Sequence, residues 1–153
     1  MLLISRFAYG NEINLCAVDE VVIASCQLDE VKHRVLSICY KNNGKNVFYR
    51  FGRKENVELF VSFSREKRIS RWIDFGTYTT YFGFRRGRYS YVLGIPEESY
   101  GARAFVKIKK DEEKVMSRNC IANSFGEKLM RSPLIEDVED EVVRRSDFIF
   151  PPK

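Results

Sequence analysis

Between residues 32 and 120 the chain alternates apolar and polar positions in short stretches, a period of two that is typical of half-buried β-strands. In residues 57–63, for example, every second residue from Val57 to Phe63 is apolar. The same kind of pattern predicts further strands over Lys32–Tyr40, Lys45–Gly52, Thr77–Phe84, Arg88–Ile95, Ala102–Lys109 and Lys114–Cys120. We therefore expect a domain built mainly from β-strands.

Turn residues separate these stretches. Asn42-Asn43-Gly44 and Arg85-Arg86-Gly87 each precede a return strand, and residues of this kind adopt the left-handed backbone of tight hairpins. Pro96 ends another strand because it has no N–H for the ladder. The pattern predicts an all-β fold, a small antiparallel barrel or sandwich of about seven to eight strands. Periodicity alone does not decide between barrel and sandwich.

The C-terminal part of the chain has a different pattern. Ser132 and Pro133 are typical of a helix start, because proline is favoured at the first helical position. Leu134, Val138 and Val142 follow at four-residue spacing, which predicts a short amphipathic helix. We therefore divide the chain into an antiparallel β-domain over residues 11–122 and a tail with a short helix over residues 123–153.

The charges are unevenly placed along the 153 residues, whose net charge is +5. Residues 50–110 contain 14 Lys and Arg against 6 Asp and Glu, a net +8, whereas residues 111–153 contain 7 against 10, a net −3. A basic face of this kind suits nucleic acid, anionic lipid, an acidic glycan or an acidic protein. The alternative is a solvated strand face whose charges resist edge-to-edge aggregation.

The start of the chain and its four cysteines bear on the compartment. Apolar residues 2–4 followed by Ala8-Tyr9-Gly10 resemble the end of a secretory signal, so we interpret residues 1–10 as a signal-peptide remnant, with a short apolar strand as the alternative. Four cysteines allow two disulfides in any of three connectivities, or buried free thiols. Export and disulfides support each other and favour a periplasmic or secreted protein. No apolar run approaches the roughly 20 residues of a transmembrane segment.

The sequence contains no motif for nucleophilic, metal or phosphate chemistry. It has no G-x-S-x-G elbow, no C-x-x-C pair and no phosphate-binding glycine loop. The single histidine, His33, falls in a predicted strand, which favours a solvent-facing side chain without an orienting partner. Glu97 and Glu98 are adjacent in sequence and so point in different directions. We expect a protein that is not an enzyme and that uses no metal or cofactor.

Aromatic and basic residues interleave in residues 81–94, YFGFRRGRYSYVLG. An RNA-recognition strand carries a basic residue, a glycine and then alternating aromatics that stack on bases. The stretch Arg86–Tyr91 comes close, but Arg88 stands where an aromatic is required. The simpler interpretation is a β-hairpin whose aromatics pack largely in the core, with Arg85, Arg86 and Arg88 at its turn.

Several segments resemble a group of small exported bacterial β-proteins, over roughly residues 24–120. These segments are Cys26-Gln27-Leu28, Val35–Tyr40, Val47–Gly52, Val57-Glu58-Leu59 and Gly87–Tyr91. More distantly, the arrangement is similar to the periplasmic inhibitors of C-type lysozyme, which place an early cysteine before a hairpin and a later one near the end of a small barrel. Those inhibitors insert a loop into the cleft of the enzyme. No functional residue of that family is carried over to this chain.

The resemblance implies an inhibitor or an immunity protein whose partner is an extracytoplasmic enzyme or toxin. With it we expect the disulfides Cys39–Cys120 and Cys16–Cys26, and Cys26–Cys39 with Cys16–Cys120 as the main alternative. The loops expected to protrude toward a partner are Arg65–Arg71, Arg85–Arg88 and Pro96–Gly101. The candidate partner-binding residues are Arg68, Arg71, Arg85, Arg86 and Arg88.

Two other functions stay open. The first is a nucleic-acid or polyanion-binding module that uses Arg85, Arg86, Arg88, Tyr89 and Tyr91, since single-stranded nucleic acids are bound by basic grooves with exposed aromatics. The second is a structural component of a surface assembly.

Overall fold

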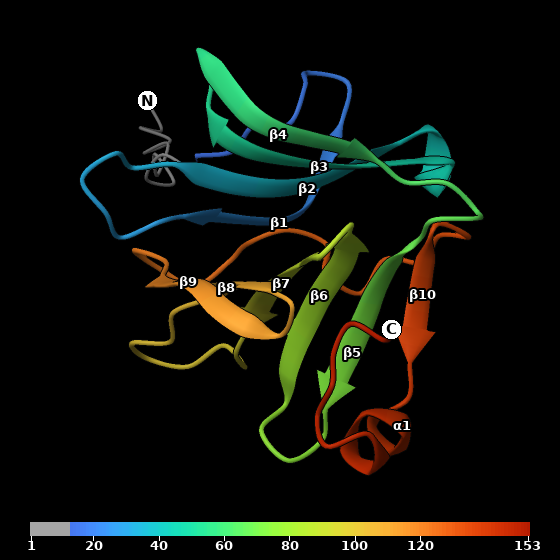
Figure 1. Cartoon of the computed structure of the whole chain (residues 1–153). Coiled ribbons are helices and arrows are strands. Elements are labelled where there is room, and N and C mark those ends of the chain that lie inside the picture. Colours follow the sequence, from blue (N-terminus) through green and yellow to red (C-terminus); the bar gives the residue numbers. More distant parts are fainter. Residues whose placement is uncertain (1–12) are drawn as a thin grey trace, which may run out of the picture.

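The structure is a computed structural model and describes residues 13–153. It consists of two β-sheets and a short α-helix (Figure 1). The first sheet is antiparallel, with the strand order β1-β2-β3-β4. Its strands are β1 (Val21–Gln27), β2 (Val35–Lys41), β3 (Asn46–Arg53) and β4 (Asn56–Ser62), and the 3₁₀ turn η1 (Asn42–Gly44) joins β2 to β3.

The second sheet has six strands in the order β10-β5-β6-β7-β8-β9. They are β5 (Ile69–Asp74), β6 (Thr79–Arg86), β7 (Tyr89–Ile95), β8 (Phe105–Lys110), β9 (Glu113–Asn119) and β10 (Ile135–Val138), and the helix α1 (Asp140–Arg145) follows. All neighbours in this sheet are antiparallel except β10 and β5, which are parallel. The predicted all-β class with a short C-terminal helix is confirmed. The alternation did not predict β1, β5 or β10.

The two sheets form a sandwich-like pair of layers, and neither sheet closes into a barrel. In Figure 1 the strands β1–β4 run across the view, whereas β5, β6 and β10 run steeply across that direction. An isolated bridge between Leu28 and Cys120 joins the end of β1 to the end of β9. This corner connection holds the two layers together where their strands diverge.

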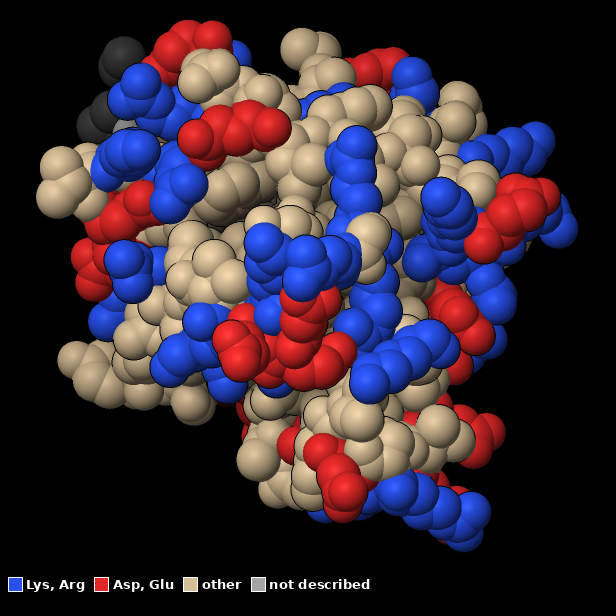
Figure 2. Space-filling model, viewed as in Figure 1, with Lys and Arg blue, Asp and Glu red and all other residues tan. Residues whose placement is uncertain are grey.

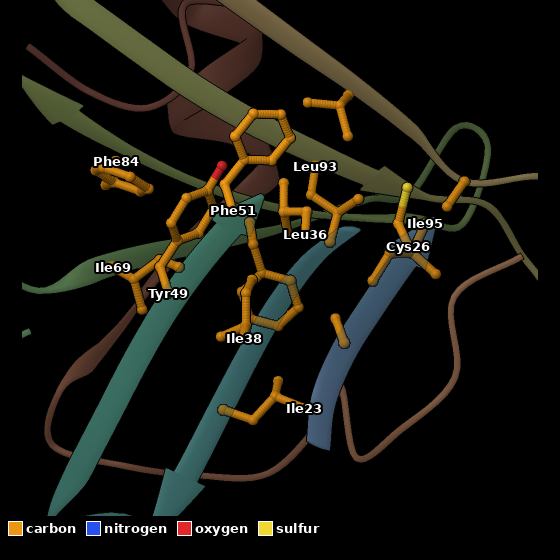
Figure 3. Close-up of a cluster of buried hydrophobic side chains, with 14 of the residues drawn as sticks. Ile23, Cys26, Leu36, Ile38, Tyr49, Phe51, Ile69, Phe84, Leu93 and Ile95 are labelled. Carbon is orange, nitrogen blue, oxygen red and sulfur yellow. The ribbon is translucent and has the colours of Figure 1, made fainter. Parts of the chain in front are cut away.

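Side chains from the two facing layers fill the core (Figure 3). The buried apolar residues of β2 and β3 on this face follow the alternation, namely Leu36, Ile38, Val47, Tyr49 and Phe51. They meet Phe84 of β6 and Leu93 and Ile95 of β7, which are equally buried. The Tyr49 ring lies edge-on to the Phe84 ring, with 4.8 Å between centroids. Burial of this interlocking layer is the main source of stability, because apolar area removed from water is the dominant favourable contribution to folding.

The disulfides are Cys16–Cys39 and Cys26–Cys120, and the described residues contain no free cysteine. The four cysteines are paired as expected for a disulfide-bonded protein, but both pairings expected with the resemblance were wrong. Strand alternation gives the reason. Cys26 and Cys120 belong to the core cluster, whereas Cys39 points to the outer face of the first sheet, where the segment before β1 lies. Cys39 and Cys120 are therefore on opposite sides of that sheet.

The C-terminal tail completes the second sheet. The helix predicted after Pro133 is wrong in its start, because Ile135–Val138 forms β10 beside β5 and the helix begins only at Asp140. Beyond the helix, the tail packs on the outer face of the sheet. The Phe150 ring lies 5.7 Å from Trp72 and 6.2 Å from Tyr81, measured between centroids. Gly83 permits this approach, since a Cβ there would lie 2.8 Å from the Phe150 ring.

Some predictions concern segments outside the regular strands. His33 lies in the turn before β2 with a positive φ of 50°, so its predicted strand position is wrong, although its side chain is exposed as expected. The proposed signal remnant, residues 1–10, lies outside the described residues. No helix within residues 13–153 is long and apolar enough to span a membrane.

Candidate functional site

Among the connections that we expected to protrude, the loop between β7 and β8 is exposed and carries acidic groups without ion-pair partners in the described residues. All residues from Glu97 to Gly101 are exposed, and Tyr100 is fully open to solvent. Gly101 has a φ of +79°, and no atom lies within 4 Å of where a Cβ would be. The turn therefore uses the backbone freedom of glycine at the tip and places Tyr100 beside it, away from the body of the protein.

The base of this loop is fastened to the second disulfide. The side-chain amide of Asn123 donates to the carbonyl of Pro96 at 3.2 Å. The N–H of Cys120 donates to the carbonyl of Ala104 at 2.8 Å, and the Arg103 guanidinium donates to the carbonyl of Cys120 at 2.7 Å. Since Cys120 is bonded to Cys26 of β1, the loop begins and ends on a cross-linked part of the sandwich.

The two acidic side chains of the loop have no ion-pair partners within residues 13–153, whereas Arg103 near its end pairs with Asp29 at 2.9 Å. Neither Glu97 nor Glu98 forms an ion pair there, although the chain as a whole is basic. Beside Glu98 lies a recess of about 380 Å³, which is also lined by Ile23 and by residues 123–126 and 128. The exposed tyrosine ring can pack into a partner, and the two neighbouring carboxylates can accept hydrogen bonds from its Arg or Lys side chains.

The basic and aromatic stretch around residues 81–94 is the β6–β7 hairpin, as expected. Gly87 occupies its turn with a φ of +59°, which two-residue hairpin turns favour. Phe82 and Phe84 are buried, and the Tyr91 ring stacks on Phe84 with 4.9 Å between centroids. These rings therefore belong to the interior packing and do not form an open stacking surface.

Two of the three hairpin arginines are bound within the molecule. Arg85 donates to the carbonyl of Pro151 at 2.7 Å and to the carboxylate of Glu112 at 2.8 Å. Arg88 pairs with Asp111 and lowers the pKa of that carboxyl group below its ordinary value. Arg86 is exposed and forms no ion pair within the described residues. On the face shown in Figure 2, acidic side chains are interspersed among Lys and Arg, so the surface there is not uniformly basic.

Arg68 and Arg71 were expected in a protruding connection, but Arg71 lies within β5. Arg68 pairs with Glu136 at 3.2 Å on the surface. Arg71 is buried, and its guanidinium makes two bonds to Asp137, at 2.7 and 3.0 Å, and a third to the carbonyl of Met130 at 2.6 Å. These bonds attach the tail to β5.

Arg71 also lines an open groove of about 560 Å³ between β5, β10 and the start of α1. The face of β5 that carries Ile69 into the core carries Arg71 and Ile73 into this groove, whose rim includes the exposed Phe75 and Leu129. Most of its carboxylates have internal partners. Asp140, for example, bonds to Arg144 at 2.8 Å and to the indole N–H of Trp72, and the Arg144 bond lowers the pKa of Asp140.

The outer face of β8 and β9 carries a basic strip. Lys107, Lys109 and Lys114 share this face, because Lys107 and Lys109 alternate along β8 and Lys109 is paired with Lys114 in the register. None of the three forms an ion pair within residues 13–153. These lysines are not among the binding residues predicted from the sequence, although the alternation of residues 105–110 is a signal that could have identified them.

No catalytic arrangement connects the residues considered above. His33 and the carboxylates Glu97 and Glu98 lie on separate exposed turns. Cys16, Glu20 and Cys39 have their ligand atoms within 4.8 Å of one another. The two sulfurs, however, are bonded to each other, so they cannot act as thiolate ligands for a metal ion.

Comparisons with protein-family models, with curated proteins and with solved structures find no match to this chain. The geometry of the described residues therefore carries the functional argument. It ranks the β7–β8 loop above the hairpin arginines, because the loop has exposed groups without internal partners and the hairpin largely does not.

Proposed function

We propose that this is an exported, non-catalytic binding protein that inhibits or neutralises an extracytoplasmic enzyme or toxin with the β7–β8 loop. The observation that carries the proposal is the fully exposed Tyr100 beside the unpaired carboxylates of Glu97 and Glu98, on a loop whose base is fastened to a disulfide. A partner-binding loop on a rigid base loses little conformational entropy on binding, and this favours affinity.

Two further observations support this function. Two disulfides are typical of proteins that fold in oxidising compartments, such as the periplasm or the extracellular space. The resemblance to periplasmic inhibitors of C-type lysozyme also implies insertion of a loop into a cleft. Those lysozymes are strongly basic, and a net-basic inhibitor would be repelled at long range. A locally acidic loop reduces this repulsion at the point of contact.

Inhibition can be measured as the slower clearing of a cell-wall suspension by a C-type lysozyme. In this assay Tyr100→Ala should weaken inhibition by at least about 30-fold, the size of a binding hot spot. Glu97→Lys should weaken inhibition less than Tyr100→Ala does, because it reverses a charge at the rim of the contact. Its effect should be larger at low salt than at high salt.

Two matched variants serve as controls. Tyr78→Ala removes another exposed tyrosine, from the β5–β6 turn, and Glu66→Lys makes the same charge change in the β4–β5 connection. Both should inhibit like the wild-type protein. Absence of inhibition, or inhibition that Tyr100→Ala leaves unchanged, would refute the proposal for this enzyme class.

A second function, the binding of a polyanion, is favoured by the strip of Lys107, Lys109 and Lys114. Binding of a single-stranded oligonucleotide should then weaken steeply with salt. The variant with all three lysines changed to glutamine should lose this binding, whereas the variant with Arg85 and Arg88 changed to glutamine should retain most of it, because those arginines are already paired. The reverse order of effects would show that the polyanion binds at the arginines of the β6–β7 hairpin and not at the lysine strip.

A further inference from the structure

Within residues 13–153 the sandwich has four strand edges, and three of them are protected. The free edge of β1 is covered by the segment 121–127, where the N–H of Glu127 donates to the carbonyl of Val22 and the N–H of Ile121 donates to that of Gln27. The outer strand β9 carries charges along its length, and β10 is only four residues long, with two acidic residues. Covering, charging and shortening are the usual ways in which proteins prevent unwanted pairing of an edge strand.

The fourth edge, β4, has little of this protection. No strand or covering segment pairs with its outer side within residues 13–153. Its sequence, NVELFVS, has a single charged residue, Glu58, and that carboxylate lies 3.4 Å from the Arg34 guanidinium. Val57 is 42% and Phe60 49% exposed. A long, apolar and uncovered edge strand is a template for another strand.

The pairing with β3 shows which backbone groups of β4 are open. The N–H of Phe63 donates to the carbonyl of Val47, so the hydrogen-bonded pairs continue through Tyr49 with Val61 and Phe51 with Leu59. The intervening residues Phe60 and Ser62 therefore direct their N–H and C=O groups away from β3. These groups form the free hydrogen-bonding edge.

Phe60 also sits on an aromatic patch of the outer face. Its ring stacks on Phe48 of β3 with 5.7 Å between centroids, and the Arg50 guanidinium lies 5.2 Å from the centre of each ring. Arg50 is in turn held by Glu20. The Arg50 charge is thus paired within the molecule, and the Phe60 side chain is still 49% exposed to a neighbour.

We propose that β4 pairs with β4 of a second copy of this protein, antiparallel, across a two-fold axis at Phe60. In this register Phe60 meets its own copy, Leu59 lies opposite Val61, and Glu58 lies opposite Ser62. No like charges meet along the strand, and just beyond its ends Glu55 of one copy approaches Arg65 of the other. The β4 sequence is therefore complementary to itself, which a two-fold interface requires.

The product is a continuous eight-stranded sheet formed by the two four-stranded sheets. A contact between two single strands is at the small end of protein interfaces, so the dimer should be weak and dependent on concentration. The β7–β8 loop makes no contribution to this contact. The dimer therefore stands or falls independently of the proposed inhibition.

Sedimentation velocity of the disulfide-bonded protein tests the proposal, over roughly 5 to 500 µM, the range in which weak dimers of this size form. The wild-type protein should shift from monomer to dimer. Phe60→Lys places two ammonium groups at the axis and should raise the dissociation constant at least about tenfold, because like charges directly opposite are unfavourable. Val115→Lys makes the same kind of change on the β9 edge and should leave dimerisation unchanged.

Position 62 tests the register. Ser62→Lys faces Glu58 of the second copy and should tighten the dimer by about threefold, whereas Ser62→Glu should weaken it by a similar factor. Circular dichroism and urea unfolding of each variant verify that it is folded. A monomer at every concentration, or a dimer that Phe60→Lys does not weaken, would overturn the proposal. Equal effects of the two Ser62 variants would overturn the register.

Discussion

The two disulfides should contribute unequally to stability, and the loop lengths give the size of the difference. Cys26–Cys120 closes a loop with a sequence separation of 94, and Cys16–Cys39 one of 23. The chain-entropy relation gives about 4.7 kcal/mol for the longer loop and about 3.4 kcal/mol for the shorter one, a difference of about 1.3 kcal/mol. The longer cross-link restricts the unfolded chain more, because it removes more of its conformations.

The perturbation is a pair of double variants, Cys26→Ala with Cys120→Ala and Cys16→Ala with Cys39→Ala. Urea unfolding without reductant, followed by circular dichroism, gives the free energy of unfolding of each variant. The loss of buried sulfur atoms should also lower the free energy of unfolding more in the Cys26 and Cys120 variant. Both of those residues are in the core, whereas Cys16 is partly exposed. If removal of Cys16–Cys39 costs as much as removal of Cys26–Cys120, or more, the loop-length reasoning is refuted.

Three further predictions concern single side chains. The Tyr49 hydroxyl is buried without a hydrogen-bond partner. Tyr49→Phe should therefore raise the free energy of unfolding, measured in urea, by about 1 kcal/mol. A loss of stability would show that the hydroxyl does form a hydrogen bond. Arg71→Met should lower the free energy of unfolding by about 3 kcal/mol, because Arg71 is buried. Arg68→Met, at an exposed ion pair, should lower it by less than about 1 kcal/mol. Equal losses would show that burial does not set the contribution of these two arginines. Burial raises the pKa of Glu20, but the hydrogen bonds and charge of Arg50 outweigh it and lower this pKa below its ordinary value of 4.5. The ionised carboxylate therefore stabilises the fold above that pH, and this contribution is lost as the pH falls through the lower pKa of the folded protein. Glu20→Gln should therefore flatten the decline of thermal stability between about pH 5 and pH 3. An unchanged slope would show that Glu20 does not contribute.

The strands that the sequence predicted are those whose residues alternate along the chain or that end at turn residues. The hairpin β6–β7 and the strands β3 and β4 lie within two residues of their predicted bounds, because alternation and turn residues are visible locally. β1 has four successive buried residues. It therefore shows no alternation, since the segments 13–20 and 121–127 cover the side and edge that would otherwise be polar. β10 is too short for a pattern, and its pairing with β5 depends on a strand 66 residues earlier in the chain.

The candidate site was predictable only in part. Pro96 and Gly101 marked a loop that protrudes, and the structure places Tyr100 at its tip. The sequence also ranked Arg85 and Arg88 as partner-binding residues, because it could not show that Asp111 and Glu112 on the next turn reach them. Ion pairs of this kind join residues that are more than 20 positions apart.

By itself, then, the sequence determined the β-rich class, most of the strands and the turns, because these follow from the period of side chains along an extended backbone and from residues that permit tight turns. Only the tertiary structure decided which cysteines pair, which arginines are already bound and which strand edge is left uncovered. The reason is that each of these depends on contacts between segments distant in sequence, such as Cys26 with Cys120 and Arg85 with Pro151. Those contacts exist only after the two sheets have packed, so no local pattern records them.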